Sequence, residues 1–117
     1  MTQIPLYPLR LAPIYQYRLW GGRRLANLLS APLPGDGPIG EAWILSDRED
    51  HMSQVANGPL NGRTLGELRE QFQEQLMGKL AYHFRRFPLL LKFLDAHEML
   101  SVQVHPTAAR TDLLPAG

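Results

Sequence analysis

The sequence predicts a mostly β fold with a helical insertion, of the α+β class. Ten prolines and ten glycines are spread along the 117 residues, which is too many for a helical bundle and is typical of β-rich domains with frequent turns. Several segments alternate apolar and polar residues near a period of two, as half-buried strands do. One longer segment instead has apolar residues three or four apart, which indicates an amphipathic helix.

The elements of the first third of the chain follow from these patterns. Residues 9–20 predict a strand that Pro13 interrupts, because proline cannot donate a ladder hydrogen bond. Residues 23–29 carry leucines at helical spacing and predict a short helix. Residues 32–38 hold three prolines and two glycines and predict an irregular loop. Residues 39–46 predict a strand in which alternate side chains face opposite sides.

The middle of the chain contains the most clearly defined helix. The charged run 47–50 predicts a solvated turn, and residues 53–56 predict a short return strand. Thr64 and Glu67 form a capping-box pattern, in which each side chain satisfies a free amide at the start of a helix. We therefore expect a helical segment over about residues 64–80. Its buried stripe comprises Leu65, Leu68, Phe72, Leu76 and Leu80.

The last third predicts two strands, over residues 89–94 and 100–104, with a short polar link at 95–98. Strict alternation in the second strand places Ser101, Gln103 and His105 on one face and apolar residues on the other. An amide oxygen and an imidazole nitrogen two residues apart on a strand can converge on one divalent ion. A solvated polar face explains the same spacing, so both readings stay open at this point.

Composition excludes several classes of protein and site. Lys and Arg number 12 against 11 Asp and Glu, a net charge of +1, which argues against a nucleic-acid-binding protein. No apolar run approaches the length that crosses a membrane, and no secretory signal pattern begins the chain, so we expect a cytoplasmic protein. The absence of cysteine restricts any metal site to His, carboxylate or amide ligands.

Five short phrases stand in a fixed order between about residues 9 and 106. They are Arg18-Leu19-Trp20-Gly21-Gly22, Ile39-Gly40-Glu41-Ala42-Trp43, Asn57-Gly58-Pro59-Leu60-Asn61-Gly62-Arg63-Thr64-Leu65, Phe87-Pro88-Leu89-Leu90-Leu91-Lys92 and Ser101-Val102-Gln103-Val104-His105-Pro106. Together they resemble the N-terminal part of the type I mannose-6-phosphate isomerases. The resemblance implies a zinc-dependent enzyme of the cupin superfamily, with a β jelly roll and a helical insertion, that interconverts mannose 6-phosphate and fructose 6-phosphate.

The resemblance also implies a metal site. It makes Gln103 and His105 the first two zinc ligands, which agrees with the polar face of the last predicted strand. The zinc would bind the sugar near O1 and O2 while a proton moves between C1 and C2. The family often continues its His-Pro pair with Asp, whereas Thr107 follows here. The catalytic acid and base residues are not assigned.

Four residues are expected on the substrate side of the site by the same resemblance, namely Trp20, Glu41, Lys92 and Ser101. Three of them have structural alternatives. Trp20 would also fit a packed aromatic before a glycine turn, Glu41 a surface strand residue and Lys92 a cation on an edge strand. The expected partner is a small phosphosugar, with neither nucleic acid nor membrane.

The family places its third ligand, Glu, and its fourth, His, beyond Gly117. We therefore expect residues 1–117 to be the N-terminal portion of an incomplete cupin-like domain, a partial jelly roll whose unpaired sheet edges favour self-association. An alternative is a cupin-like sugar-binding or interaction module without catalytic activity.

Overall fold

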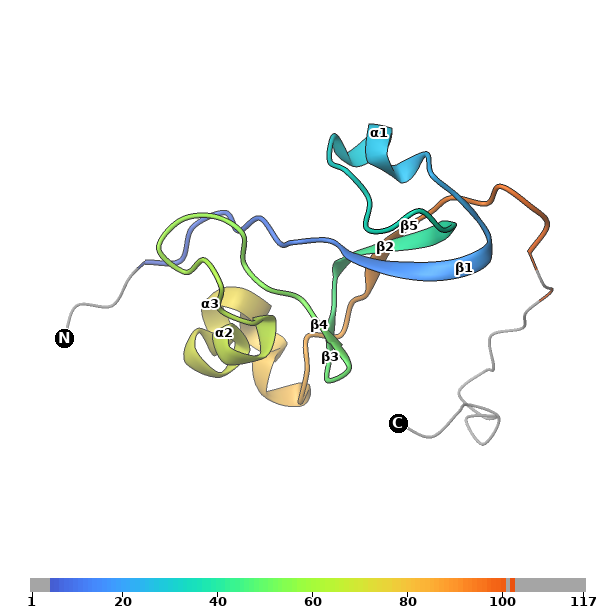
Figure 1. Ribbon diagram of the computed structural model, residues 1–117. Coiled ribbons are helices and arrows are strands. Elements are labelled where there is room, and N and C mark those ends of the chain that lie inside the picture. The colour runs from blue at the N-terminus through green and yellow to red at the C-terminus, as the bar shows by residue number, and fades with distance from the viewer. Residues whose placement is uncertain (1–4, 101, 103–117) are drawn as a thin grey trace.

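The computed structural model describes residues 5–100 and residue 102 (Figure 1). Two antiparallel sheets and four helical segments make up this part of the chain. The strands are β1 (Ile14–Gly22), β2 (Ile39–Leu45), β3 (Asp47–Arg48), β4 (His51–Met52) and β5 (Leu91–Leu94), and the helices are α1 (Leu25–Leu29), α2 (Leu65–Gln71), α3 (Gln73–Met77) and the 3-10 helix η1 (Gly78–His83). This confirms the prediction of a mostly β chain with a helical insertion. No helix in the described residues is both long and apolar enough to cross a membrane.

The larger sheet has the strand order β1-β2-β5. The pairing of β1 with β2 is irregular, because the register shifts on both sides of Tyr17. Beyond the shift the two backbones approach closely. A Cβ atom on Gly21 would lie 2.5 Å from the amide nitrogen of Gly40, so only glycine fits at this position. The expected interruption is also present, since β1 begins directly after Pro13.

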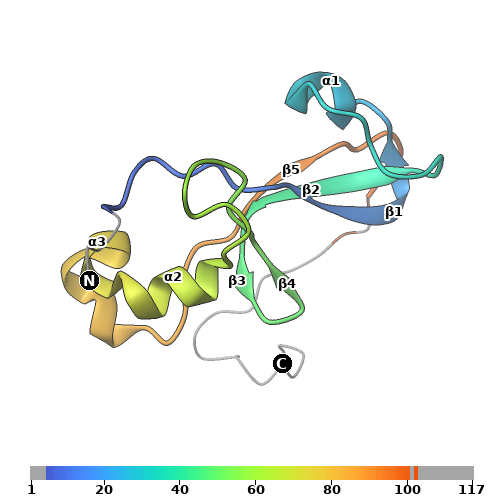
Figure 2. The same cartoon turned by 60° about the vertical axis from the view of Figure 1, so that its left-hand side comes forward.

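One face of this sheet is covered by α1 and the loop that follows it, as the views in Figures 1 and 2 both show. The helix and loop contribute Leu25 and Leu33 to an apolar cluster with Ile39 and Ala42 of β2. Ser30 ends the helix in the left-handed conformation, with a φ of 51°. Glu41 is the neighbour of Ala42 on β2, so its side chain points to the opposite face of the sheet.

The helical insertion begins as the sequence predicts but is shorter and more broken. The Thr64 hydroxyl accepts the Glu67 amide at 3.2 Å, which confirms the helix cap. The helix breaks at Phe72, whose φ of −120° and ψ of 38° are not helical, and it ends at Gly78. Phe72 remains buried. Leu80, expected on the buried stripe, is 59% exposed, because the chain has changed to a 3-10 helix by then.

A second apolar cluster holds the helices in place. It is formed by Val55, Leu60, Leu68 and Phe72, with leucines of the N-terminal segment packed against it. The N-terminal segment is joined to it by an isolated bridge between Leu11 and Val55. The return strand expected over residues 53–56 is replaced by β4 and by isolated bridges at Gln54 and Val55.

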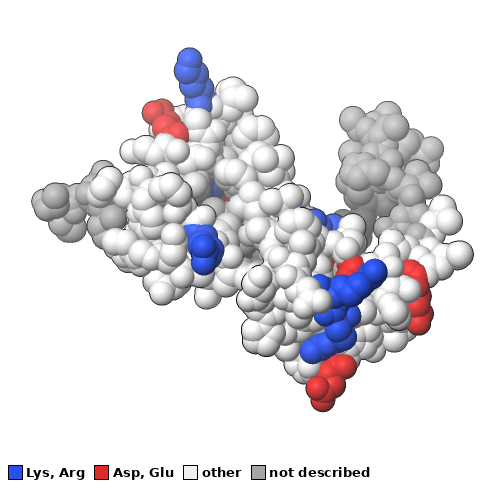
Figure 3. Space-filling model, turned by 90° about the horizontal axis from the view of Figure 1, so that it is seen from above, with Lys and Arg blue, Asp and Glu red and all other residues white. Residues whose placement is uncertain are grey.

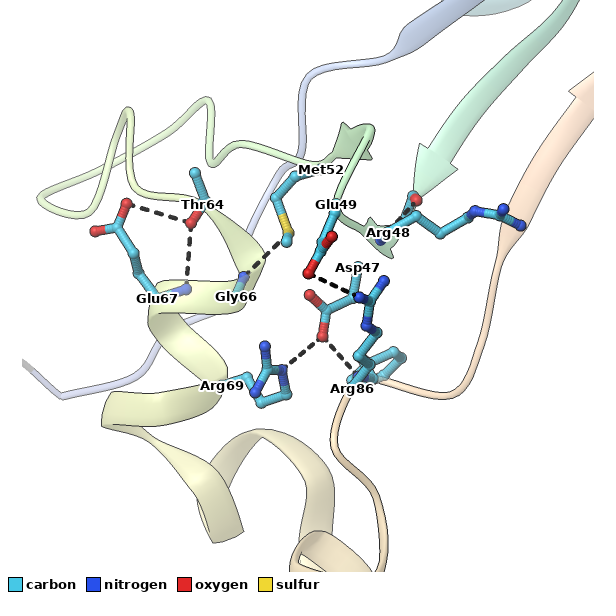
Figure 4. Close-up of polar contacts among 11 residues, drawn as sticks. Asp47, Arg48, Glu49, Met52, Thr64, Gly66, Glu67, Arg69 and Arg86 are labelled. Carbon is cyan, nitrogen blue, oxygen red and sulfur yellow. Dashed lines mark hydrogen bonds and ion pairs between the residues drawn. The ribbon is translucent and has the colours of Figure 1, made fainter. Parts of the chain in front are cut away.

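The charged run after β2 is largely the exposed turn that the sequence predicts, since Arg48, Glu49 and Asp50 are exposed and the last two form the turn of the hairpin β3–β4. Its first residue, Asp47, differs, because it is only 2% exposed (Figure 4). The Asp47 carboxylate accepts the Arg69 Nε of α2 at 2.7 Å and the Phe87 amide at 2.7 Å. A single buried carboxylate therefore connects the hairpin, the helix and the segment that leads into β5.

Candidate functional site

A buried carboxylate, Glu41, lies at the centre of the polar face of the larger sheet. It is 4% exposed, so it is not the surface strand residue that the alternative interpretation required. Its Oε2 accepts the Arg18 Nε at 2.8 Å. Its Oε1 lies 2.8 Å from the Lys92 Nζ and accepts the Trp43 indole N–H at 3.0 Å. One carboxylate thus receives three donors, two of them cations.

The strand register explains why these side chains meet. Glu41 and Trp43 stand two residues apart on β2 and therefore point to the same face. Lys92 of β5 lies directly opposite Trp43, and its Nζ is 5.8 Å from the centre of the Trp43 ring. Of the residues expected on the substrate side, the structure brings Glu41 and Lys92 into direct contact.

The neighbours of Glu41 control its charge. Burial by itself would raise the pKa of Glu41. The hydrogen bonds from Lys92 and Trp43 and the positive charges of Lys92 and Arg18 outweigh burial, so the pKa of this carboxyl lies below its ordinary value. Glu41 is therefore ionised at neutral pH. Because one negative charge faces two positive ones, the cluster as a whole is cationic.

Trp20 lies at the far end of β1, beside this cluster. A Cβ atom on Gly40, the neighbour of Glu41, would lie 2.7 Å from the Trp20 ring and 2.6 Å from the Arg18 Cβ. The indole and the aliphatic part of Arg18 therefore pack against the bare backbone of β2. The Trp20 carbonyl also accepts the amides of His97 and Glu98, both at 2.9 Å. Trp20 is thus a packed aromatic at the edge of the site.

A second buried carboxylate, Asp95, directly follows β5. It is 4% exposed and accepts both the backbone amide of Arg24 at 2.9 Å and the Arg24 Nε at 2.7 Å. Burial by itself would raise the pKa of Asp95. The hydrogen bonds and positive charge of Arg24, with a smaller contribution from His97, outweigh burial, so the pKa of Asp95 lies below its ordinary value. The sequence placed Asp95 in a polar link and gave no sign of this burial.

The expected metal ligands, Gln103 and His105, and the expected substrate residue Ser101 lie outside the described residues. Among residues 5–100 and 102, no three His, Asp or Glu side chains come together as a metal site would require. The strand expected over residues 100–104 likewise falls almost entirely outside the described part.

Sequence reasoning missed Arg18 and Trp43 as partners of Glu41. Arg18 stands two residues before Trp20 in a segment of period two, so a shared face could have been inferred from the spacing. The contact with Glu41 depends on the irregular pairing of β1 with β2, for which the sequence carries no signal.

The charged side chains of the described residues are unevenly distributed on the face seen in Figure 3. Most of its Lys and Arg side chains lie near Asp or Glu side chains, one group stands alone, and uncharged surface separates the groups.

Two relatives from Bacillus subtilis align with most of this chain. The putative mannose-6-phosphate isomerase YvyI of Bacillus subtilis is 40% identical over 106 residues, and the mannose-6-phosphate isomerase ManA of the same organism is 42% identical over 106 residues. Both alignments cover 91% of this chain and 31% of the relative, so the chain spans about a third of their length.

The fold agrees with a solved relative. The crystal structure of a mannose 6-phosphate isomerase from Bacillus subtilis matches with a TM-score of 0.66 at 38% identity, over 76% of this chain and 27% of the other. The family model of the phosphomannose isomerase type I catalytic domain matches residues 8–116. The chain therefore belongs to the type I phosphomannose isomerase family.

Proposed function

We propose that this chain supplies the N-terminal part of a zinc-dependent isomerase that interconverts mannose 6-phosphate and fructose 6-phosphate. The observation that carries the proposal is the family match over residues 8–116. The Glu41 cluster adds support, because Glu41 and Lys92, both expected on the substrate side, lie in contact on one face of the sheet. The complete protein would form a cupin-type jelly roll, to which the chain contributes the sheets β1-β2-β5 and β3-β4.

The donor set fits the proposed metal. An amide oxygen from Gln103 and an imidazole nitrogen from His105 are ligands that zinc accepts, and a site of three or four protein ligands would need a carboxylate and another imidazole besides. When bound, the zinc supplies Lewis-acid polarisation of the sugar oxygens. Residues 1–117 supply two of the proposed ligands, so the isolated chain lacks the full site.

The residues of the chain have separate roles in this proposal. The Lys92 side chain is 37% exposed, so its ammonium remains accessible to an anionic sugar phosphate while Glu41 fixes its position. The excess positive charge of the cluster favours approach of the anion. Trp20 bounds this face of the site, and Ser101 is assigned to the substrate side by the family resemblance alone.

The isolated chain should be nearly inactive. With two proposed metal ligands and no assigned acid or base, we expect negligible turnover of mannose 6-phosphate by residues 1–117 in the presence of added zinc. Turnover comparable with that of a full-length relative would contradict this assignment of the ligands.

A chimeric enzyme tests the function itself. Residues 8–116 would replace the matching segment of Bacillus subtilis ManA, and conversion of mannose 6-phosphate would be followed with a coupled assay. We expect an active chimera in which Gln103→Ala or His105→Ala lowers both bound zinc and kcat, the latter by at least about 100-fold. Gln75→Ala and His83→Ala remove the same residue types from exposed helical positions and should change neither. Ligand variants as active as these controls would contradict the proposed site.

The cellular location is part of the same proposal. We assign the protein to the cytoplasm, with which the absence of cysteine is compatible.

The edge of the larger sheet predicts self-association. Within the described residues β5 pairs only with β2 and carries four exposed residues, so the isolated chain should self-associate through this edge. Size-exclusion chromatography should show a dimer at high concentration, and a strictly monomeric profile would count against it.

A further inference from the structure

Burial of side chains contributes little to holding β5, the strand that carries Lys92, in place. All four residues of β5 are exposed, and three of them are apolar residues with 41–54% of their surface accessible. In the described part of the chain, β5 pairs only with β2, and that register shifts near Leu45. Burial of β5 side chains therefore cannot fix the position of Lys92.

The residue that directly follows β5 has the opposite character. The Asp95 side chain is 2% exposed and makes contacts through both its oxygens. Its Oδ2 accepts the Arg24 amide and its Oδ1 accepts the Arg24 Nε, while its own amide donates to the Gly40 carbonyl at 2.8 Å. A Cβ atom on Gly22 would lie 2.9 Å from Oδ2, so the carboxylate also rests against the end of β1.

These contacts join the end of β5 to both other strands next to the Glu41 cluster. Gly40 directly precedes Glu41, and Asp95 follows Lys92 by three residues. We propose that Asp95 is a positioning residue, which fixes the end of β5 against β1 and β2 and thereby holds the Lys92 ammonium against Glu41. The substrate role of Lys92 rests on the proposed function, whereas the positioning itself does not.

The titration of Glu41 distinguishes positioning from a general effect on stability. The charged groups that contact Glu41 are Arg18 of β1 and Lys92 of β5, so a displaced β5 would leave it with one cation. Its pKa would then rise. Removal of the negative charge of Asp95 without displacement would act in the reverse direction and lower the pKa of Glu41. A variant that is less stable but unchanged in position would leave this pKa near its value in the unaltered chain.

The experiment is a carboxyl carbon NMR titration of Glu41 in the full 117-residue chain. Lys92→Met defines the pKa expected when the ammonium is lost. We expect Asp95→Asn to raise the pKa of Glu41 by at least half the shift seen with Lys92→Met, because the amide cannot accept a charged hydrogen bond from the guanidinium as the carboxylate does. Asp36→Asn, at an exposed loop position, should leave it unchanged. An unchanged or lowered pKa of Glu41 in folded Asp95→Asn would overturn the proposal.

A second variant covers the case in which Asp95→Asn does not fold. The Arg24 side chain is 68% exposed, so Arg24→Lys should fold, and it keeps the positive charge and the backbone amide while it loses the guanidinium contact. We expect a rise of the pKa of Glu41 that is smaller than in Asp95→Asn. An unchanged or lowered pKa of Glu41 in Arg24→Lys would overturn the proposal. Neither titration needs substrate or metal, so an inactive chimera would count against the proposed function and leave this result unaffected.

Discussion

The helical region, residues 53–87 with α2, α3 and η1, and the sheet region, formed by β1, β2, β5 and α1, are stabilised in different ways. The helical region packs around the apolar cluster of Val55, Leu60, Leu68 and Phe72. The sheet region has a similar cluster on the face that α1 covers, but its other face is organised by ion pairs around Glu41. Apolar burial thus supports the scaffold, and buried carboxylates arrange the residues of the candidate site.

The largest expected effect is the loss of a core leucine from the helical region. Leu68 is fully buried, whereas Leu91 at the start of β5 is 52% exposed. Leu68→Ala should lower the free energy of unfolding by about 2–5 kcal/mol, because it removes apolar contacts and leaves a cavity. Leu91→Ala should lower it by less than about 1 kcal/mol. Equal midpoint shifts in urea unfolding would remove the contrast between the two regions.

A smaller effect should follow the loss of the buried carboxylate that joins the hairpin β3–β4 to the helical region. Asp47→Ala leaves the Arg69 guanidinium and the Phe87 amide without their acceptor, and it should lower the free energy of unfolding by about 1–3 kcal/mol. Glu49→Ala removes the exposed ion pair with Arg86, which should contribute at most about 0.5 kcal/mol. If the two variants unfold at the same urea concentration, Asp47 is not a structural link.

The cap of α2 should contribute less again. Thr64→Ala removes the hydroxyl that accepts the Glu67 amide and should lower the free energy of unfolding by about 1 kcal/mol. Thr64→Ser retains the hydroxyl and should restore most of this loss. A serine variant as unstable as the alanine variant would show that the hydroxyl is not the source of the effect.

The smallest expected effect is the part of the pH dependence of stability that comes from Glu41 in the sheet region. The pKa of Glu41 is lowered in the folded chain, so its contribution to stability is present above the unfolded value of about 4.3 and is lost as pH falls through the folded value. Urea midpoints measured from pH 7 to about pH 3 should therefore decline less steeply below about pH 4.3 in Glu41→Gln than in the unaltered chain. Identical slopes would show that Glu41 gains no net stabilisation from its partners.

Local patterns predicted the elements well. The cap at Thr64, the short helix after the Gly-Gly pair and the strand before Asp47 all depend on residues close in sequence, and the structure contains each of them. The break at Phe72 was missed because the apolar spacing continues unchanged through it. Phe72 itself is buried at the break, as a continuous helix would also require, so the hydrophobic pattern carries no trace of the break.

The polar interior was harder to predict, because its partners are distant in sequence. Asp47 meets Phe87 across 40 residues, and Asp95 meets the Arg24 backbone across 71. Nothing in the local composition distinguishes these carboxylates from the exposed ones beside them. The family resemblance identified Glu41 and Lys92 individually, but their contact follows only from the register of β2 with β5.

The most direct test of the account is whether the polar face of the sheet, and not the helical region, serves the substrate. In the chimera with Bacillus subtilis ManA, Lys92→Met and Lys79→Met each remove one ammonium, the first from β5 and the second from η1. We predict that Lys92→Met lowers kcat/KM for mannose 6-phosphate by at least about tenfold, while Lys79→Met changes it by less than about twofold. Equal kcat/KM values for the two variants would contradict the account.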